Sequence, residues 1–429
     1  MDPQRTLESL FAWSPHKEAT YGAVMADAKF THATWLEGFE PPDLVKQFRS
    51  DANQAWRGTE FPTFRVQQRQ GVSYPINVPL SAQLMAMIAG FSMGKVVSVE
   101  TEAGPPAAYT HLITLQDPLI DGKQMPSTEQ WFKAAADLGL KVKGAVCSSF
   151  SVAYARGNPN ITLNSQWVGS GDYVNADLAD VPALDAESLL GLLFEKDMVI
   201  KLGTPGSEGD ISDRVAAVSI EIAGGAANTA WDYYPGTGLY AGRKLMGGRS
   251  VVPQLTLLAK ETDDILTLLM GDTEQGLRVT WTGDTITGGE KFKVDIYIPS
   301  VHLTAAKLGE QEGYVVWQLA PGAEGVFKKM ATKTITASPT GAVRASNVVT
   351  ITTSTVHGAQ QGDHVTVAGV TNTSFNGRFL IASVPTTATF TYAQTAADGT
   401  SGAGTANIET AVVRVTVENK EAAYVTVGA

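Results

Sequence analysis

The chain has 429 residues and a mass of 45.4 kDa, which favours two or three domains. A hydrophobic content of 44% is enough for packed cores and excludes a disordered chain. The net charge of −11 argues against a nucleic-acid-binding surface, which needs clustered lysine and arginine.

The other bulk features predict a soluble protein made in a reducing cytoplasm. The single cysteine, Cys147, cannot form an internal disulfide and is expected on the polar side of a strand. The first 20 residues lack the basic start and apolar core of a signal peptide. No apolar run approaches the roughly 20 residues that a membrane-spanning helix needs.

Residues 1–57 are predicted to form an irregular N-terminal arm. Aromatic side chains stand between its polar and proline positions, among them Tyr21, Trp35, Phe39, Phe48 and Trp56. Such an arm packs either on a body larger than itself or on its own domain, and the sequence leaves both open.

The next segment, residues 58–175, is predicted to alternate strands with short helices. Phe61–Val78 alternates apolar and polar residues, which is typical of a strand with one buried face. Pro79 suits the first turn of a following helix, and Gly90 would end it. Thr110–Leu115 is predicted as another short strand.

Met125–Gly171 has the clearest local pattern. Ser127 and Gln130 fit a capping box, which predicts a short helix that ends at Gly139. Lys141–Ala155 then alternates, with an expected buried face of Val142, Val146, Phe150, Val152 and Tyr154. A turn at 157–160 leads to a return strand through Trp167. The hairpin contains no catalytic side chain, so it is better suited to line a lumen or contact a neighbouring subunit than to form an active site.

Residues 176–331 are predicted to hold further strands and one short helix. The expected strands are 189–203, 215–223, 251–260, 277–282, 291–298 and 315–319, and the helix is capped at 262–264 and ends at Gly271. A long loop at 224–248 carries Trp231, Tyr233, Tyr234 and Tyr240. These aromatic residues could stack on sugars or bury against a neighbouring subunit, and we favour the subunit.

Composition shifts near Met330. Residues 332–405 are rich in Thr, Ala, Gly, Val and Ser, and their short, closely spaced strands are typical of a small β-sandwich. Val413–Val417 is more charged and resembles the larger body again. We therefore expect the sandwich to be inserted before the last strand of a domain formed by 176–331 and 406–429.

Two weak similarities favour an internal duplication over chance. The strand-then-helix segment at 61–90 resembles 251–271, and the strand at 148–160 resembles 217–228. The fold class expected from all these elements is mainly β, with a body of two related halves and short flanking helices.

Residue patterns for catalysis or metal binding were not found. No two of the six histidines lie three to five residues apart, and no nucleophile elbow, P-loop or dinucleotide-binding motif is present. Nothing nominates the pair of carboxylates that a glycan-cleaving enzyme needs. We expect no cofactor, no metal and no enzymatic activity.

Several short segments occur in the same order as similar segments of a known protein family. The chain has KEATYG at 17–22, YTH at 109–111, PST at 126–128, RSVVPQLTL at 249–257 and IPSV at 298–301. Together with the elements between them, these resemble the tail tube proteins (major tail proteins) of long, flexible-tailed bacteriophages. Residues 332–405, with VTNTSFNG at 370–377, resemble the Ig-like modules of phage tails.

The resemblance implies a structural virion protein of the phage tail, assembled in the host cytoplasm. Its subunits would stack as rings around a channel that passes genomic DNA without specific binding, and an acidic protein suits that task. A duplicated body favours three chains per pseudo-sixfold ring, with six chains as the alternative. Other implied partners are the tape measure, terminator and distal tail proteins, and cell-surface glycans contacted weakly by the Ig-like module.

The candidate inter-subunit contacts are Tyr21, Trp35, Trp56, Trp231, Tyr233, Tyr234 and Tyr240. The alternative function is a carbohydrate-binding adhesin or receptor-binding tail protein. Under that alternative, an exposed aromatic residue of 332–405 such as Tyr392 would contact the sugar.

Overall fold

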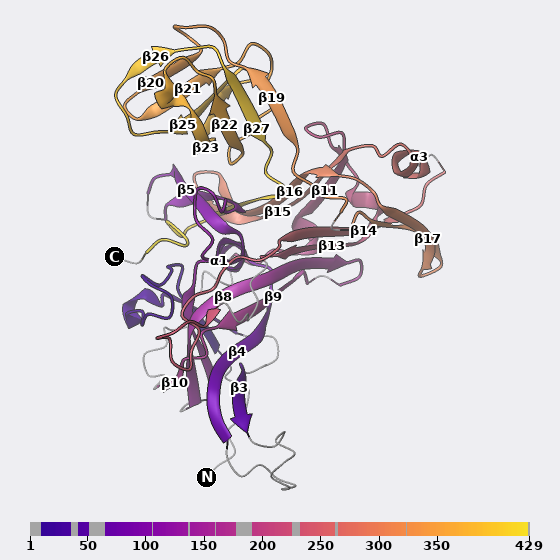
Figure 1. The fold of residues 1–429 in the computed structure, drawn as a ribbon. Coiled ribbons are helices and arrows are strands. Elements are labelled where there is room, and N and C mark those ends of the chain that lie inside the picture. Colours follow the sequence, from indigo (N-terminus) through magenta and orange to yellow (C-terminus); the bar gives the residue numbers. More distant parts are fainter. Residues whose placement is uncertain are drawn as a thin grey trace, which may run out of the picture.

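The computed structural model describes residues 10–35, 42–50, 65–104, 106–135, 138–158, 160–176, 191–224, 232–261, 265–322 and 324–427. This part of the chain is mainly β, which confirms the predicted class. Two large sheets form a body, and two small sheets form a separate unit at the top of Figure 1.

The larger sheet of the body is organised around the 18-residue strand β8 (Leu138–Ala155). On one side follow β9 (Thr162–Gly169), β4 (Arg65–Pro79) and β3 (Asp43–Ser50). On the other side follow β13 (Val215–Ala223), β14 (Ser250–Leu258), β18 (Tyr314–Ala320) and β17 (Ala305–Gln311). The first part of β8 also pairs with β10 (Tyr173–Ala176) and with β7 (Thr128–Ala135), which continues to β1 (Leu10–Trp13) and β2 (His32–Trp35).

The second sheet of the body has seven described strands. Their order is β12 (Gly209–Asp210), β11 (Met198–Gly203), β15 (Gln275–Thr287), β16 (Glu290–Val301), β28 (Arg414–Asn419), β6 (Ala108–Leu115) and β5 (Gly94–Glu102). Short helical turns are η2 (Asp27–Lys29), η5 (Glu195–Asp197) and η6 (Ser212–Arg214).

Helix α1 (Ala82–Met93) packs against both sheets of the body and is buried along its whole length. Ser81 caps it by accepting a hydrogen bond from the Leu84 amide at 3.2 Å, and Gly94 ends it with φ of 89°. The helix therefore starts after Pro79 and runs beyond the predicted end at Gly90. A second helix, α3 (Ile265–Met270), agrees with the predicted one, whose cap at 262–264 lies outside the described residues.

Residues 330–409 form what we call the C-terminal unit. One sheet has β19 (Met330–Thr334), β27 (Thr405–Glu409), β22 (His364–Ala368) and β23 (Gly377–Leu380). The other has β24 (Ser383–Thr386), β25 (Thr389–Ala393), β21 (Val348–Thr352), β20 (Ala342–Ala345) and β26 (Gly399–Ser401), and η8 (Thr373–Phe375) lies between β22 and β23 in the chain. The unit has its own core, and the chain then returns to the body as β28, between β6 and β16.

The helix predicted from Ser127 to Gly139 is wrong, because this segment forms the strand β7. Both faces of β7 are buried: Phe132 packs on Phe11 with ring centroids 5.3 Å apart, and Trp131 stacks on Phe30 at 4.0 Å. A strand covered on both faces has consecutive apolar residues, so its sequence does not alternate. Gln130 accepts a hydrogen bond from Tyr74 Oη at 2.6 Å instead of closing a capping box.

The predicted polar position of Cys147 and the predicted partners of Val146 are also wrong. The pairing of β8 shifts register between Val142 and Ala145 and again between Cys147 and Ser149. Because of these bulges, Cys147 is buried in the main core with Phe150. Val146 instead packs with Met125 and Val168 in a separate small cluster.

The irregular arm expected at 1–57 is wrong for the part that the structure describes. β1, β2 and β3 all belong to the larger sheet of the body. The predicted strand at 189–203 is shorter than expected, because its described residues form a strand only over Met198–Gly203.

Candidate assembly site

In the larger sheet, the eight described strands β3, β4, β9, β8, β13, β14, β18 and β17 lie side by side in this order, and the path ends at β3 and β17. β3 and β17 lie far apart in Figure 1, and each pairs with one described strand only, β4 and β18 respectively. Five large apolar side chains near the β17 end are more than half exposed, namely Leu266, Met270, Leu308, Tyr314 and Val315. An open strand edge beside exposed apolar side chains is a surface on which another chain can pair.

The strand order along this path repeats. Residues 43–169 place β3, β4, β9 and β8 side by side, and residues 215–320 place β13, β14, β18 and β17 in the corresponding order. In each series the first two strands pair, a helix follows, a hairpin enters the second sheet, and a second hairpin returns. β8 and β13 join the two series, with Val152 opposite Ile220. The sequence similarity between 148–160 and 217–228 links β8 with β13, whereas the repeated order matches β13 with β3 and β8 with β17, so this similarity does not follow the repeat.

The loop at 224–248 is fixed to the body at several points. The Lys244 ammonium lies 3.0 Å from Asp232 Oδ2, and both side chains are buried. Burial lowers the pKa of Lys244, and the hydrogen bond and negative charge of Asp232 offset only part of this decrease. Tyr233 donates a hydrogen bond to the Gln70 carbonyl at 2.8 Å and lies under the guanidinium of Arg69.

Of the candidate aromatic residues whose side chains are described, two are half-buried, Tyr21 and Tyr233, and two are exposed. Tyr234 is 48% exposed and Tyr240 is 37% exposed, so both are available for contact, whereas Tyr233 is half-buried. Trp35 lies in β2, but its side chain is outside the described residues, as are Trp56 and Trp231 entirely.

Tyr21 lies in a polar corner of the body. Neighbouring Glu18 is buried and accepts hydrogen bonds from Ser127 Oγ at 2.6 Å and from the amides of Gly144 and Gly22 at 2.7 and 2.8 Å. Burial nevertheless raises the pKa of Glu18 to about 7. Tyr21 packs over Gly144, where a Cβ atom would lie 2.9 Å from its ring. This close approach explains why glycine is needed there.

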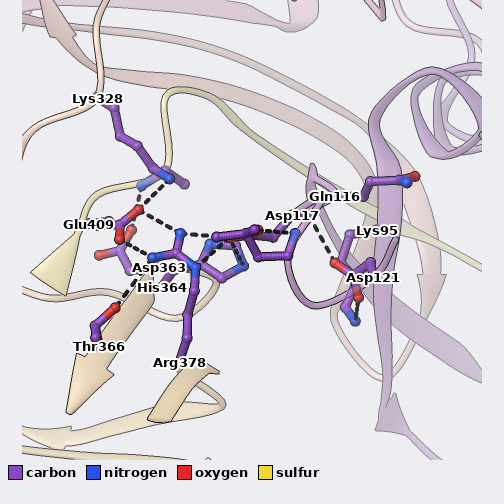
Figure 2. A network of polar contacts seen from close by, with 12 residues as sticks. Lys95, Gln116, Asp117, Asp121, Lys328, Asp363, His364, Thr366, Arg378 and Glu409 are labelled. Atoms are coloured by element: carbon purple, nitrogen blue, oxygen red, sulfur yellow. Dashed lines mark hydrogen bonds and ion pairs between the residues drawn. The ribbon is translucent and has the colours of Figure 1, made fainter. Parts of the chain in front are cut away.

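A charged network fastens the C-terminal unit to the body (Figure 2). Arg378 of β23 donates to Asp117, which follows β6, and to Glu409 of β27 at 2.6 Å. Lys328 Nζ lies 2.5 Å from Glu409 Oε2. Hydrogen bonds from Arg378 lower the pKa of Glu409 to about 2. Burial opposes ionisation of Asp117, but hydrogen bonds from the Leu119 amide and Arg378 outweigh it and lower the pKa of Asp117.

Sugar binding through Tyr392 is not supported, because that residue is not exposed. Its ring is buried and stacks on Phe379 with centroids 4.1 Å apart, and its hydroxyl donates to the Phe375 carbonyl at 2.9 Å. Tyr392 therefore belongs to the core of the C-terminal unit.

The described residues contain neither a metal-binding cluster nor a membrane-spanning helix. No group of three or more His, Cys, Asp or Glu among them could hold a metal ion. None of the helices in this part of the chain is long and apolar enough to cross a membrane.

Comparison with known proteins identifies the family of this chain. A family model described as phage tail tube protein matches residues 12–316. The chain belongs to the phage tail tube protein family. Membership makes it a structural component of the virion tail and implies that it assembles with itself and with other tail proteins.

One match of this tail tube protein to a solved structure is distant. Matching solved structures include the Dit protein of phage SPP1, described as a hub of the adsorption apparatus of phages that infect Gram-positive hosts. That match has 11% identity, covers 52% of this chain and 98% of the other, and has a TM-score of 0.16. A score this low supports no structural inference. No curated protein matches the chain significantly.

Proposed function

We propose that the chain polymerises into stacked rings that form the tail tube, the conduit for DNA ejection into the host. Each ring would close by pairing β17 of one subunit with β3 of the next. The repeated strand order carries this proposal, because β17 and β3 occupy the positions of β8 and β13 in their respective series. The proposed pairing of β17 with β3 between chains would therefore repeat the pairing of β8 with β13 inside the chain.

Two related series per chain favour three chains in a pseudo-sixfold ring over six chains. The halves would be 58–175 and 176–331 with 406–429, and β3 from the preceding residues 1–57 would complete the sheet of the first half. They share one continuous core, and in the second sheet β28 lies between the two hairpins, β5–β6 and β15–β16. Ring closure also removes both open edges, which otherwise favour uncontrolled aggregation.

The remaining roles follow from this assembly. Genomic DNA would pass through the lumen without specific binding, since a net charge of −11 disfavours contact with phosphates. Residues 332–405 would form an Ig-like module outside the tube, with weak access to cell-surface glycans. Assembly would take place in the host cytoplasm with the tape measure, terminator and distal tail proteins, and the role needs neither catalysis nor a cofactor.

Electron microscopy of the purified chain tests the proposal. The wild-type chain is expected to form hollow tubes or rings, and native mass spectrometry of rings is expected to give three subunits. Leu308→Glu places a charge on the exposed side of β17 and is expected to abolish tubes while leaving the monomer folded. Val348→Glu is the matched control, because Val348 is a similarly exposed strand residue of the C-terminal unit.

Two results would contradict the proposal. Compact monomers of the wild-type chain at high concentration would argue against a tube, and tubes formed equally well by Leu308→Glu would exclude the β17 edge. Rings of six chains would retain the tube but overturn the trimer.

A further inference from the structure

The two series of strands in the larger sheet can be aligned residue by residue through their second strands, β4 and β14. β4 ends at Pro79, β14 ends at Leu258, and a helix follows each of them. With these two ends aligned, buried residues coincide at alternate positions, namely Val72, Tyr74, Ile76 and Val78 with Val251, Pro253, Leu255 and Leu257. The two segments that resemble each other in sequence, 61–90 and 251–271, contain the same two strands.

The pairing of neighbouring strands extends this alignment to β17. Across β9, Asn77 of β4 leads to Ser151 of β8. Across β18, the equivalent Thr256 of β14 leads to Lys307 of β17. Lys307 is therefore the equivalent of Ser151, and β17 as a whole corresponds to Ser149–Ala155 in the part of β8 that pairs with β13.

The same alignment extends to β3 at the other end of the path. Glu221 of β13 lies opposite Val252 of β14, and the equivalent of Val252 in β4 is Ser73. Asp43 of β3 lies opposite Ser73. Asp43 is therefore the equivalent of Glu221.

A pairing between chains in the register used inside the chain brings opposite charges together. Inside the chain Ser151 lies opposite Glu221. The equivalent positions between chains place the exposed Lys307 opposite Asp43 of the next chain. Residues directly opposite each other on one face of an antiparallel pair interact, and opposite charges there are stabilising.

The exposure of Leu308 is consistent with this register. Leu308 is 54% exposed, whereas its equivalent in β8, Val152, is 3% exposed and lies opposite Ile220 of β13. A partner strand beside β17 would remove part of this difference. A one-residue slip would turn every side chain of β17 to the opposite face, so the buried face of the sheet resists it.

We propose that β17 pairs with β3 of a second copy of this chain in one register, with an ion pair between Lys307 of one chain and Asp43 of the next. This inference rests on the proposed ring and names the residues that select the partner strand. The internal β8–β13 junction has serine and glutamate at these positions, so the charge pair is specific to the junction between chains.

Paired cysteines test the register in assembled tubes, since the natural Cys147 is buried. Lys307→Cys with Asp43→Cys is expected to give disulfide-linked chains on a non-reducing gel, because opposite Cα atoms lie within disulfide range. These positions lie far apart within one chain, so the bond must join two chains (Figure 1). Lys307→Cys with Val45→Cys, the control, shifts the partner by two positions on the same face and is expected to give about tenfold less product.

Charge reversal tests the ion pair in the full-length chain. Lys307→Glu places two carboxylates opposite each other and is expected to lower the yield of tubes about fivefold, and adding Asp43→Lys is expected to restore it. Lys201→Glu, at an exposed position of β11, is the matched control and is expected to assemble as the wild type does. Sedimentation and electron microscopy measure the yield.

The ring and its register can fail separately. Wild-type tubes with equal or stronger cross-linking through position 45 would overturn the register but retain the tube. Wild-type tubes without recovery in the doubly reversed variant would overturn the ion pair. Wild-type chains that form no tubes or rings would overturn the proposed function and this inference with it. The charge-reversal variants decide the question if the cysteine variants fail to assemble.

Discussion

Arg378 Nη2 lies 2.6 Å from Asp117 Oδ2, across 261 positions of sequence. The carboxylate is 4% exposed and the guanidinium side chain 20% exposed, so neither charge is freely solvated. Removing one partner of such a pair costs more than the pair itself contributes, because the other charge stays buried. This shielded ion pair therefore opposes separation of the two parts of the chain.

Arg378→Met is expected to lower the free energy of unfolding by about 3 kcal/mol, because it leaves Asp117 and Glu409 without their main partner. Urea unfolding measures the change. Lys260→Met is the control, since Lys260 pairs with Asp213 at a site where both side chains are at least half exposed, and it is expected to cost at most about 1 kcal/mol. Equal losses in the two variants would show that the junction is no stronger than a surface pair.

The same network predicts a dependence of stability on pH. The pKa of Glu409 is about 2 in the folded chain, below the ordinary value of about 4.3. Its stabilising contribution is therefore present above the ordinary pKa and is lost as the pH falls from about 5 towards 2. Urea unfolding of wild type and Glu409→Gln across this range checks it: the wild-type advantage should shrink with falling pH, and a constant advantage would rule the explanation out.

Lys244→Met is expected to destabilise the body by about 3–5 kcal/mol, because Asp232 would remain buried without its cation. Replacing both residues, as Lys244→Met with Asp232→Leu, is expected to recover more than half of that loss. Urea unfolding of the single and double variants measures this coupling. A double variant as unstable as the single one would show that packing rather than charge holds the loop at 224–248.

Replacing residues 330–409 with two glycines is expected to leave the body folded and able to form tubes. The ends of the deleted segment already meet: Met330 pairs with Glu409, and the Thr410 amide donates to the Lys329 carbonyl at 2.9 Å. Circular dichroism and electron microscopy of the shortened chain provide the test. An unfolded product would show that the C-terminal unit is part of the body rather than an insertion.

Strands with one buried face were predictable from sequence, and those with two were not. In β13, Val218, Ile220 and Ile222 alternate with more exposed residues, so both period and burial were evident. β7 lacks that alternation because aromatic residues cover both its faces. The bulges that bury Cys147 depend on its neighbours in space, which no local pattern encodes.

The candidate site was harder to predict than the fold for the same reason. Tyr234 and Tyr240 could be nominated as surface aromatic residues because they lie in a long glycine-rich loop. The open edges of β3 and β17 depend on which strands pair, and the contact between Arg378 and Asp117 joins distant positions. Neither leaves a signal within a short window of sequence.

The position of β28 has a consequence for synthesis. This strand fills the gap between β6 and β16 but is translated after all of residues 330–409. On the ribosome, the second sheet of the body therefore stays in two pieces while the C-terminal unit emerges and can fold around its own core. A nascent chain cannot complete its body, and so cannot present a finished subunit to a growing polymer, until residues 414–419 have left the ribosome.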